Sequence, residues 1–105
     1  MITYNKLVRD KIPQIIEANG KKCEVKVLSQ DEYLQMLKVK LQEELDEFQS
    51  AEENKQLDEL ADLVEVVYGI IASKGVDIEA FERIRLKKKE ERGGFEDKLL
   101  LISVE

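Results

Sequence analysis

Two pairs of acidic residues stand at helical spacing near the middle of the chain. Glu44 and Glu47 form the first pair, and Glu59 and Asp62 form the second. Because three positions separate the members of each pair, both members would share one face of an α-helix. The polar stretch 50–55 between the pairs is short enough to be the turn between two antiparallel helices. Such a helical hairpin would bring the four carboxylates together.

Four neighbouring carboxylates favour the binding of a hard divalent cation. Clustered anions repel one another and raise one another's pKa values. Mg²⁺ removes that conflict, because it prefers oxygen ligands and keeps several of its waters. Mn²⁺, which also accepts carboxylate ligands, is the alternative. The competing interpretation is chance, because Asp and Glu make up 23 of the 105 residues and such spacings arise on solvated helices.

The helical wheels of the two expected helices turn these acids towards protein. The apolar stripe of the first helix consists of Leu34, Leu37, Leu41, Leu45 and Phe48. Glu44 lies at the edge of that stripe, and Glu47 lies just beyond it. Glu59 and Asp62 lie on a line that apolar residues continue further along the second helix. Acids that point towards protein need partners or a metal.

Two groups of basic residues are candidates for contact with an anion. The first group, in the polar cluster near the start of the chain, is Lys6, Arg9 and Lys11. The second lies on the last expected helix, whose apolar face of Ile78, Phe81 and Ile84 continues as Arg85, Lys88 and Arg92. For both groups the alternative is ordinary solvated charge. In the second group such charge is favourable at the C-terminus of the helix.

Capping residues and apolar periodicity predict four helices. The first two come before the polar turn at 50–55. The first begins near Asp10, a good N-cap, and ends before Gly20, a typical residue after a helix. The second opens with a capping box made by Ser29 and Glu32, and it ends near Glu52.

The third and fourth helices follow the same rules. Asn54 is the expected cap of the third helix, which runs to Lys74, and Asp77 is the expected cap of a fourth helix over 78–92. Gly69 lies inside the third helix, where glycine costs about 1 kcal/mol relative to alanine. We therefore expect another helix, of the same chain or of a partner, to approach closely there.

Two further stretches read as β-strands. Residues 22–28 alternate between apolar and polar side chains, and residues 95–104 contain an apolar run at their centre. We expect the two to pair as a small two-stranded β element packed beside the helices. The predicted fold is thus mainly α, an antiparallel bundle of about four helices in a single domain over residues 1–105.

Composition narrows the class of protein. Hydrophobic residues at 43% and charged residues at 38% describe a charge-coated, mostly helical chain, and the net charge of −6 argues against DNA or RNA as a partner. The single cysteine, Cys23, excludes an intrachain disulfide and suits a reducing cytoplasm. The lack of histidine excludes Ser–His and Cys–His catalysis. We expect neither a signal peptide nor a membrane span.

The chain resembles the MazG-like, all-α nucleoside-triphosphate pyrophosphohydrolases, and particularly their phosphoribosyl-ATP pyrophosphohydrolase-like branch. The matching acid motifs are EELDE at 43–47 and ELAD at 59–62. YNKLVRDKIP at 4–13 and ERGGF at 91–95 also match that branch. The acid pattern alone is moderately specific, whereas the motifs in this order are far more so.

The resemblance implies a helical fold that is completed as a homodimer or homotetramer. It implies hydrolysis of a nucleoside triphosphate to the monophosphate and pyrophosphate, a reaction that clears aberrant nucleotides or limits nucleotide pools. The implied ligands of Mg²⁺ are Glu44, Glu47, Glu59 and Asp62. The implied phosphate-binding residues are Lys88 and Arg92, with Lys6, Arg9 or Lys11 contributed by the N-terminal motif.

The expected mechanism is metal-assisted attack of water on a phosphate. Glu44 or Glu47 would take the proton of that water. Lys88 and Arg92 would stabilise the charge that develops on the leaving pyrophosphate. Two alternatives remain open: a phosphoribosyl-ATP pyrophosphohydrolase of histidine synthesis, and a non-enzymatic dimeric helical module whose acids only decorate its surface.

Overall fold

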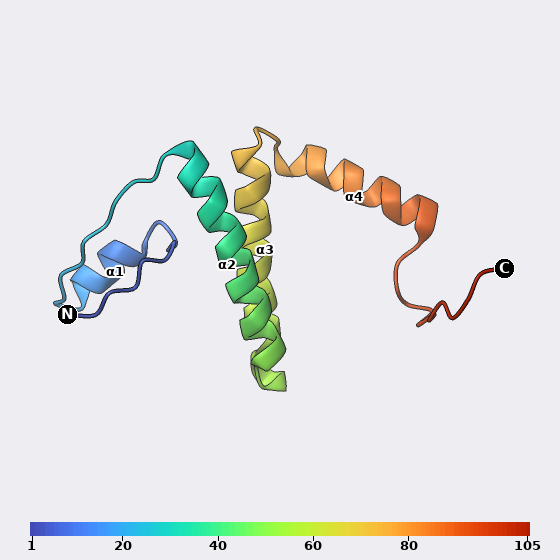
Figure 1. The fold of residues 1–105 in the computed structure, drawn as a ribbon, viewed down its shortest axis with the longest axis horizontal. Coiled ribbons are helices and arrows are strands. Elements are labelled where there is room, and N and C mark those ends of the chain that lie inside the picture. Colours follow the sequence, from blue (N-terminus) through green and yellow to red (C-terminus); the bar gives the residue numbers. More distant parts are fainter.

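The computed structural model describes all 105 residues as helices joined by extended segments (Figure 1). The elements are α1 (Ile12–Ala18), α2 (Gln30–Ser50), the 3-10 turn η1 (Glu53–Lys55), α3 (Gln56–Ser73) and α4 (Ile78–Arg92). Helices α2 and α3 form a central hairpin, with α1 on one side and α4 projecting away on the other. None of these helices combines the length and the apolar character that crossing a bilayer requires.

The capping box predicted at the start of α2 is confirmed. The Ser29 hydroxyl accepts a hydrogen bond from the backbone N–H of Glu32, and the Glu32 carboxylate accepts one from the backbone N–H of Ser29, both at 3.2 Å. This exchange satisfies two N–H groups that the helix would otherwise leave unpaired. The helix ends at Ser50, two residues before the expected end, because Ala51 adopts an extended backbone conformation.

The connection to α3 differs from the prediction at its cap. Asn54 lies inside η1, and the residue at the N-cap position of α3 is Lys55, which makes no capping hydrogen bond through its side chain. The start of α3 is therefore formed by a short 3-10 segment and has no side-chain cap. The end of α3 at Ser73 is one residue from the expected end, and Gly75 follows in a left-handed conformation with φ of 75°.

The hairpin packs tightly along a short line of small and apolar residues. The buried apolar side chains of the chain are Leu37 from α2 and Val66 and Ile71 from α3. A Cβ atom added to Gly69 would lie 3.2 Å from Cδ2 of Leu37 and 3.7 Å from the hydroxyl of Tyr33. The close approach expected at this glycine is confirmed, and the approaching helix is α2 of the same chain.

Helix α4 forms where predicted, whereas α1 begins at Ile12 with Lys11 at its N-cap position, so the predicted cap at Asp10 is wrong. Both helices are only loosely attached. Pro13 lies in the first turn of α1. Asp77 caps α4, because its carboxylate accepts a hydrogen bond of 2.7 Å from the backbone N–H of Ala80. Among the helices α4 packs only on α3, and the side chains of Ile78 and Ile84 remain about half exposed. The apolar face of α4 is therefore left largely uncovered by its own chain.

The expected two-stranded β element is wrong, because the structure contains no strand. Residues 22–28 precede α2, whereas residues 95–104 follow the far end of α4 (Figure 1), and no backbone hydrogen bond joins them. An alternating pattern stabilises a strand only when a neighbouring strand and a core face are present. Val27, which the pattern placed inward, is 95% exposed.

Replacing Ser29 by alanine is expected to lower the free energy of unfolding by about 1 kcal/mol, since it removes the cap of the longest helix. Urea unfolding followed by helical circular dichroism measures this. Ser50→Ala at the other end of α2 is the control. Its hydroxyl donates to the Asp46 carbonyl oxygen within the helix, and its effect should stay within about 0.5 kcal/mol. Equal effects of the two variants would contradict the role of the cap.

Candidate metal centre

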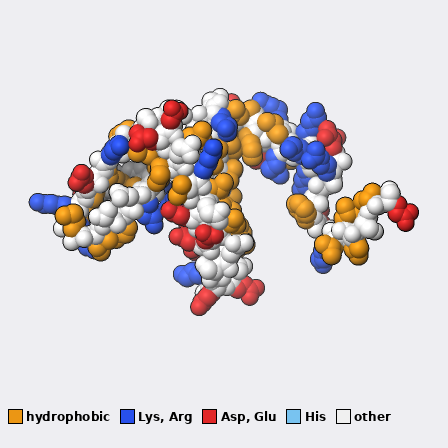
Figure 2. Space-filling view, in the orientation of Figure 1, with side chains coloured by type: hydrophobic (Ala, Val, Ile, Leu, Met, Phe, Trp, Pro, Cys, Tyr) orange, Lys and Arg blue, Asp and Glu red, His pale blue; other side chains and the backbone are white.

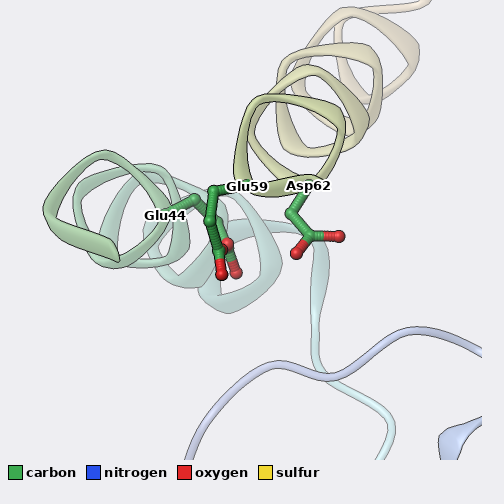
Figure 3. A group of neighbouring side chains, drawn as sticks. All are labelled: Glu44, Glu59 and Asp62. Carbon is green, nitrogen blue, oxygen red and sulfur yellow. The ribbon is translucent and has the colours of Figure 1, made fainter. Parts of the chain in front are cut away.

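The hairpin brings three of the four predicted acids together. Glu44 comes from α2, and Glu59 and Asp62 come from successive turns of α3 (Figure 3). One carboxylate oxygen from each side chain lies within 4.8 Å of the others. The antiparallel course of the two helices and the three-residue spacing on α3 produce this arrangement.

Glu47 stands at the edge of this cluster. Its side chain is exposed, and it is not among the three acids whose oxygens converge. It is nevertheless close enough to act on them, because its negative charge raises the pKa of both Glu44 and Glu59. The structure therefore places a fourth carboxylate, from α2, beside the three that meet.

Two carboxylate oxygens of the cluster are buried without a partner. Glu44 is only 6% exposed, although it is charged, and its Oε2 makes no hydrogen bond. The Oε2 atom of Glu59 is in the same situation. Burial is the main cause that raises the pKa of each, followed by the charge of Glu47. Buried oxygens without partners are costly, so this site is suited to receive a cation.

Two basic side chains already offset part of the negative charge. Lys40 Nζ lies 3.5 Å from Oε1 of Glu44 and 3.4 Å from Oε2 of Glu43. Arg9 donates a hydrogen bond of 2.8 Å to Oδ1 of Asp62. Arg9 belongs to the extended segment before α1, so residues far apart in the sequence meet at the cluster.

The residues of the cluster fit a hard divalent metal. All of its possible ligand atoms are carboxylate oxygens, which Mg²⁺ and Mn²⁺ prefer. Softer metals select sulfur or imidazole ligands instead. The unpaired oxygens of Glu44 and Glu59 are free to serve as ligands. Asp62 uses one oxygen for Arg9 and has the other available.

The remaining basic residues that the sequence singled out do not meet the acids within one chain. Lys88 and Arg92 lie on α4, which projects away from the hairpin of α2 and α3 (Figure 1). The nearby Arg85 pairs with Glu82 of its own helix at 2.6 Å. Lys6 is exposed in the N-terminal segment. Figure 2 shows the basic side chains of α4 gathered well apart from the acids of the hairpin.

Sequence reasoning assigned no role to Lys40, although the structure places it against the cluster. Its spacing of four residues from Glu44 was the available signal, because such pairs meet on one helix face. The contact of Arg9 with Asp62 had no comparable signal, since 53 positions separate the two residues.

Fold and cluster together define an all-α protein with a carboxylate-lined candidate metal centre on a helical hairpin. The family model described as phosphoribosyl-ATP pyrophosphohydrolase matches residues 14–89, which contain both helices of the hairpin. The chain belongs to this family, and the resemblance seen in its acid motifs is confirmed.

One curated relative is an uncharacterized protein of Mycolicibacterium smegmatis, with 46% identity over 46 residues. The aligned part covers 44% of this chain and 47% of the relative, so the match spans about half the length of that protein. No solved structure matches the chain.

The raised pKa of Glu44 predicts a distinct pH dependence of the metal-free protein. Between the ordinary value of 4.5 and the raised value, the folded state binds more protons than the unfolded state. The free energy of unfolding therefore falls as the pH rises through this window. Glu44→Gln cannot ionise, so this fall should be smaller in the variant, as measured by urea unfolding in a chelator.

Glu24→Gln is the matched control, because Glu24 is an exposed acid outside the cluster. Its stability should follow the pH in parallel with the wild type. If the stability of Glu44→Gln also followed the pH in parallel with the wild type, the raised pKa of Glu44 would be contradicted.

Proposed function

We propose that the protein hydrolyses a nucleoside triphosphate to the monophosphate and pyrophosphate and requires Mg²⁺. The residues proposed to hold the metal are Glu44, Glu47, Glu59 and Asp62. The observation that carries the proposal is the meeting of three of these acids, two with buried unpaired oxygens, in a chain of the phosphoribosyl-ATP pyrophosphohydrolase family. Removal of aberrant nucleotides is the role that we favour.

When bound, Mg²⁺ supplies neutralisation of phosphate charge and a water of lowered pKa. The chain's own contribution is to take a proton from the attacking water as its oxygen bonds to phosphorus and the anhydride P–O bond breaks. We propose Glu47 for this step, with Glu44 as the alternative base. Glu47 is accessible to solvent, whereas Glu44 is buried and paired with Lys40.

Basic side chains would receive the phosphates. Arg9 is already beside the acids, and Lys6 belongs to the same segment. Lys88 and Arg92 are proposed to stabilise the leaving pyrophosphate. Helix α4 carries Lys88 and Arg92 away from the acids of its own chain. We therefore propose that they bind the pyrophosphate at the metal centre of a partner subunit.

The dimensions of the chain support an oligomer. Its radius of gyration is 18.0 Å, whereas a compact domain of this length has about 13 Å. Its accessible surface is 9690 Å², whereas a compact monomer of this mass exposes roughly 6,000 Å². The excess is of the size that obligate subunit interfaces bury. We propose a homodimer or homotetramer whose interface covers the apolar face of α4.

Phosphoribosyl-ATP is the second candidate substrate, and the description of the matching family favours it. It carries the same triphosphate, so the metal centre and the basic residues would have the same tasks. A panel of ordinary nucleotides, damaged nucleotides and phosphoribosyl-ATP separates the two candidates by relative kcat/KM.

Asp62→Asn is expected to lower Mg²⁺-dependent pyrophosphate release by about 100-fold or more, since changes even to the outer partners of metal ligands cost 10–100-fold. Mg²⁺ should also raise the unfolding temperature of the wild type but not that of the variant. Asp46→Asn, an exposed acid of α2 that accepts from Gln42, should behave as the wild type. Unchanged turnover in Asp62→Asn would remove the proposal, and a non-enzymatic module predicts neither turnover nor stabilisation by Mg²⁺.

Ile84→Asp is expected to convert the oligomer to a monomer, because it places a charge on the uncovered face of α4. Sedimentation velocity measures this change. Pyrophosphate release should fall with the oligomer, while stabilisation of the hairpin by Mg²⁺ persists. Val104→Asp, at an exposed apolar residue outside the helices, is the control. A wild-type chain that sediments as a monomer would contradict the proposed assembly.

A further inference from the structure

A cavity of about 230 Å³ lies between the N-terminal segment and the two helices of the hairpin. The apolar part of its lining is Leu7 and Val8 from the segment, Leu37 from α2 and Val66 from α3. The charged part also includes Arg9, Asp10, Lys40 and Glu65. Two acids of the metal centre, Glu44 and Asp62, line the same cavity. The cavity is therefore continuous with the candidate metal centre.

We infer that this cavity binds the base of the nucleotide while the phosphates lie at its acidic end, an inference that rests on the proposed function. The volume is below the 300–1,000 Å³ of pockets that take a whole drug-sized ligand. It thus suits a single ring system. A flat base gains from contact with the apolar part of the lining, whereas the phosphates suit the charged end, where Arg9 and Lys40 also line the cavity.

Tyr33 supplies the aromatic and polar features that base recognition uses. It lines the cavity next to Gly69. A Cβ atom at position 69 would lie 3.7 Å from the Tyr33 hydroxyl and 3.2 Å from Leu37, so glycine keeps this wall clear. Aromatic rings stack on bases, and a phenol hydroxyl can donate to or accept from the edge of a base. Tyr33 is thereby a specificity-determining residue.

The N-terminal wall of the cavity is fastened to the metal centre itself. Figure 3 shows the N-terminal chain passing on the side towards which the carboxylates point, and Arg9 joins this chain to Asp62 at 2.8 Å. The side chains of Arg9 and Asp62 are 55% and 45% exposed. Such exposed pairs are weak, so this ion pair contributes little to holding the N-terminal wall against the hairpin.

The test uses the full chain in a chelator, with methyl NMR during titration by the four common nucleosides. A sugar phosphate without a base is the negative control. At least one nucleoside should shift the methyl signals of Leu7, Val8, Leu37 and Val66 together, and the sugar phosphate should not. Nucleoside shifts that are absent, or that concentrate on Ile84 and Leu86 of α4, would overturn the inference.

Two variants sharpen the test. Val8→Ala should weaken nucleoside binding roughly fivefold, because buried methyl groups are lost from the contact. Val27→Ala, at a valine that is 95% exposed in the other extended segment, should bind as the wild type. Tyr33→Phe should change the order of preference among the nucleosides. Equal affinities in all three variants and the wild type would reject the pocket.

The inference and the proposed function fail in distinguishable ways. Nucleoside binding at these methyl groups without any pyrophosphate release would reject the proposed hydrolysis and retain the pocket. Pyrophosphate release with the same KM and the same base preference in Val8→Ala and Tyr33→Phe would retain the hydrolysis and reject the pocket.

Discussion

The close packing of α2 against α3 is the constraint on which the rest of the structure depends. At Gly69 the two helices approach so nearly that Leu37 fills the space a side chain would need. The same packing brings the carboxylates of Glu44 and Glu59 close together, and one buried oxygen of each has no hydrogen-bond partner. Packing thus holds carboxylates together against their repulsion, and cations must supply the compensation that the helices do not.

The local parts of the fold could be predicted from the sequence. Ser29 and Asp77 mark helix starts because a cap is an interaction among residues three positions apart. The strand at 22–28 could not be judged in this way, because alternation does not say whether a partner exists. Its proposed partner lies beyond α4, whose direction depends on the turn between α3 and α4.

In the candidate site, too, the features set by a single helix could be predicted and those set by the whole fold could not. Helical wheels placed Glu44 beside the core, and the structure buries it to 6% exposure. They placed Lys88 on an inward side as well, yet this chain alone offers no core on that side of α4. A wheel gives a direction around one helix axis and contains nothing about where the axis points. Contacts such as Arg9 with Asp62 depend on the whole path of the chain.

The hairpin has a consequence for how the chain folds. Glu44, Glu59 and Asp62 belong to two consecutive helices joined by a short turn. Closing so short a loop costs little entropy, and contacts between neighbours in the sequence form rapidly. The carboxylate cluster can therefore arise early, before Arg9 docks. A divalent ion at the proposed metal centre would then stabilise the hairpin before the N-terminal segment packs on it.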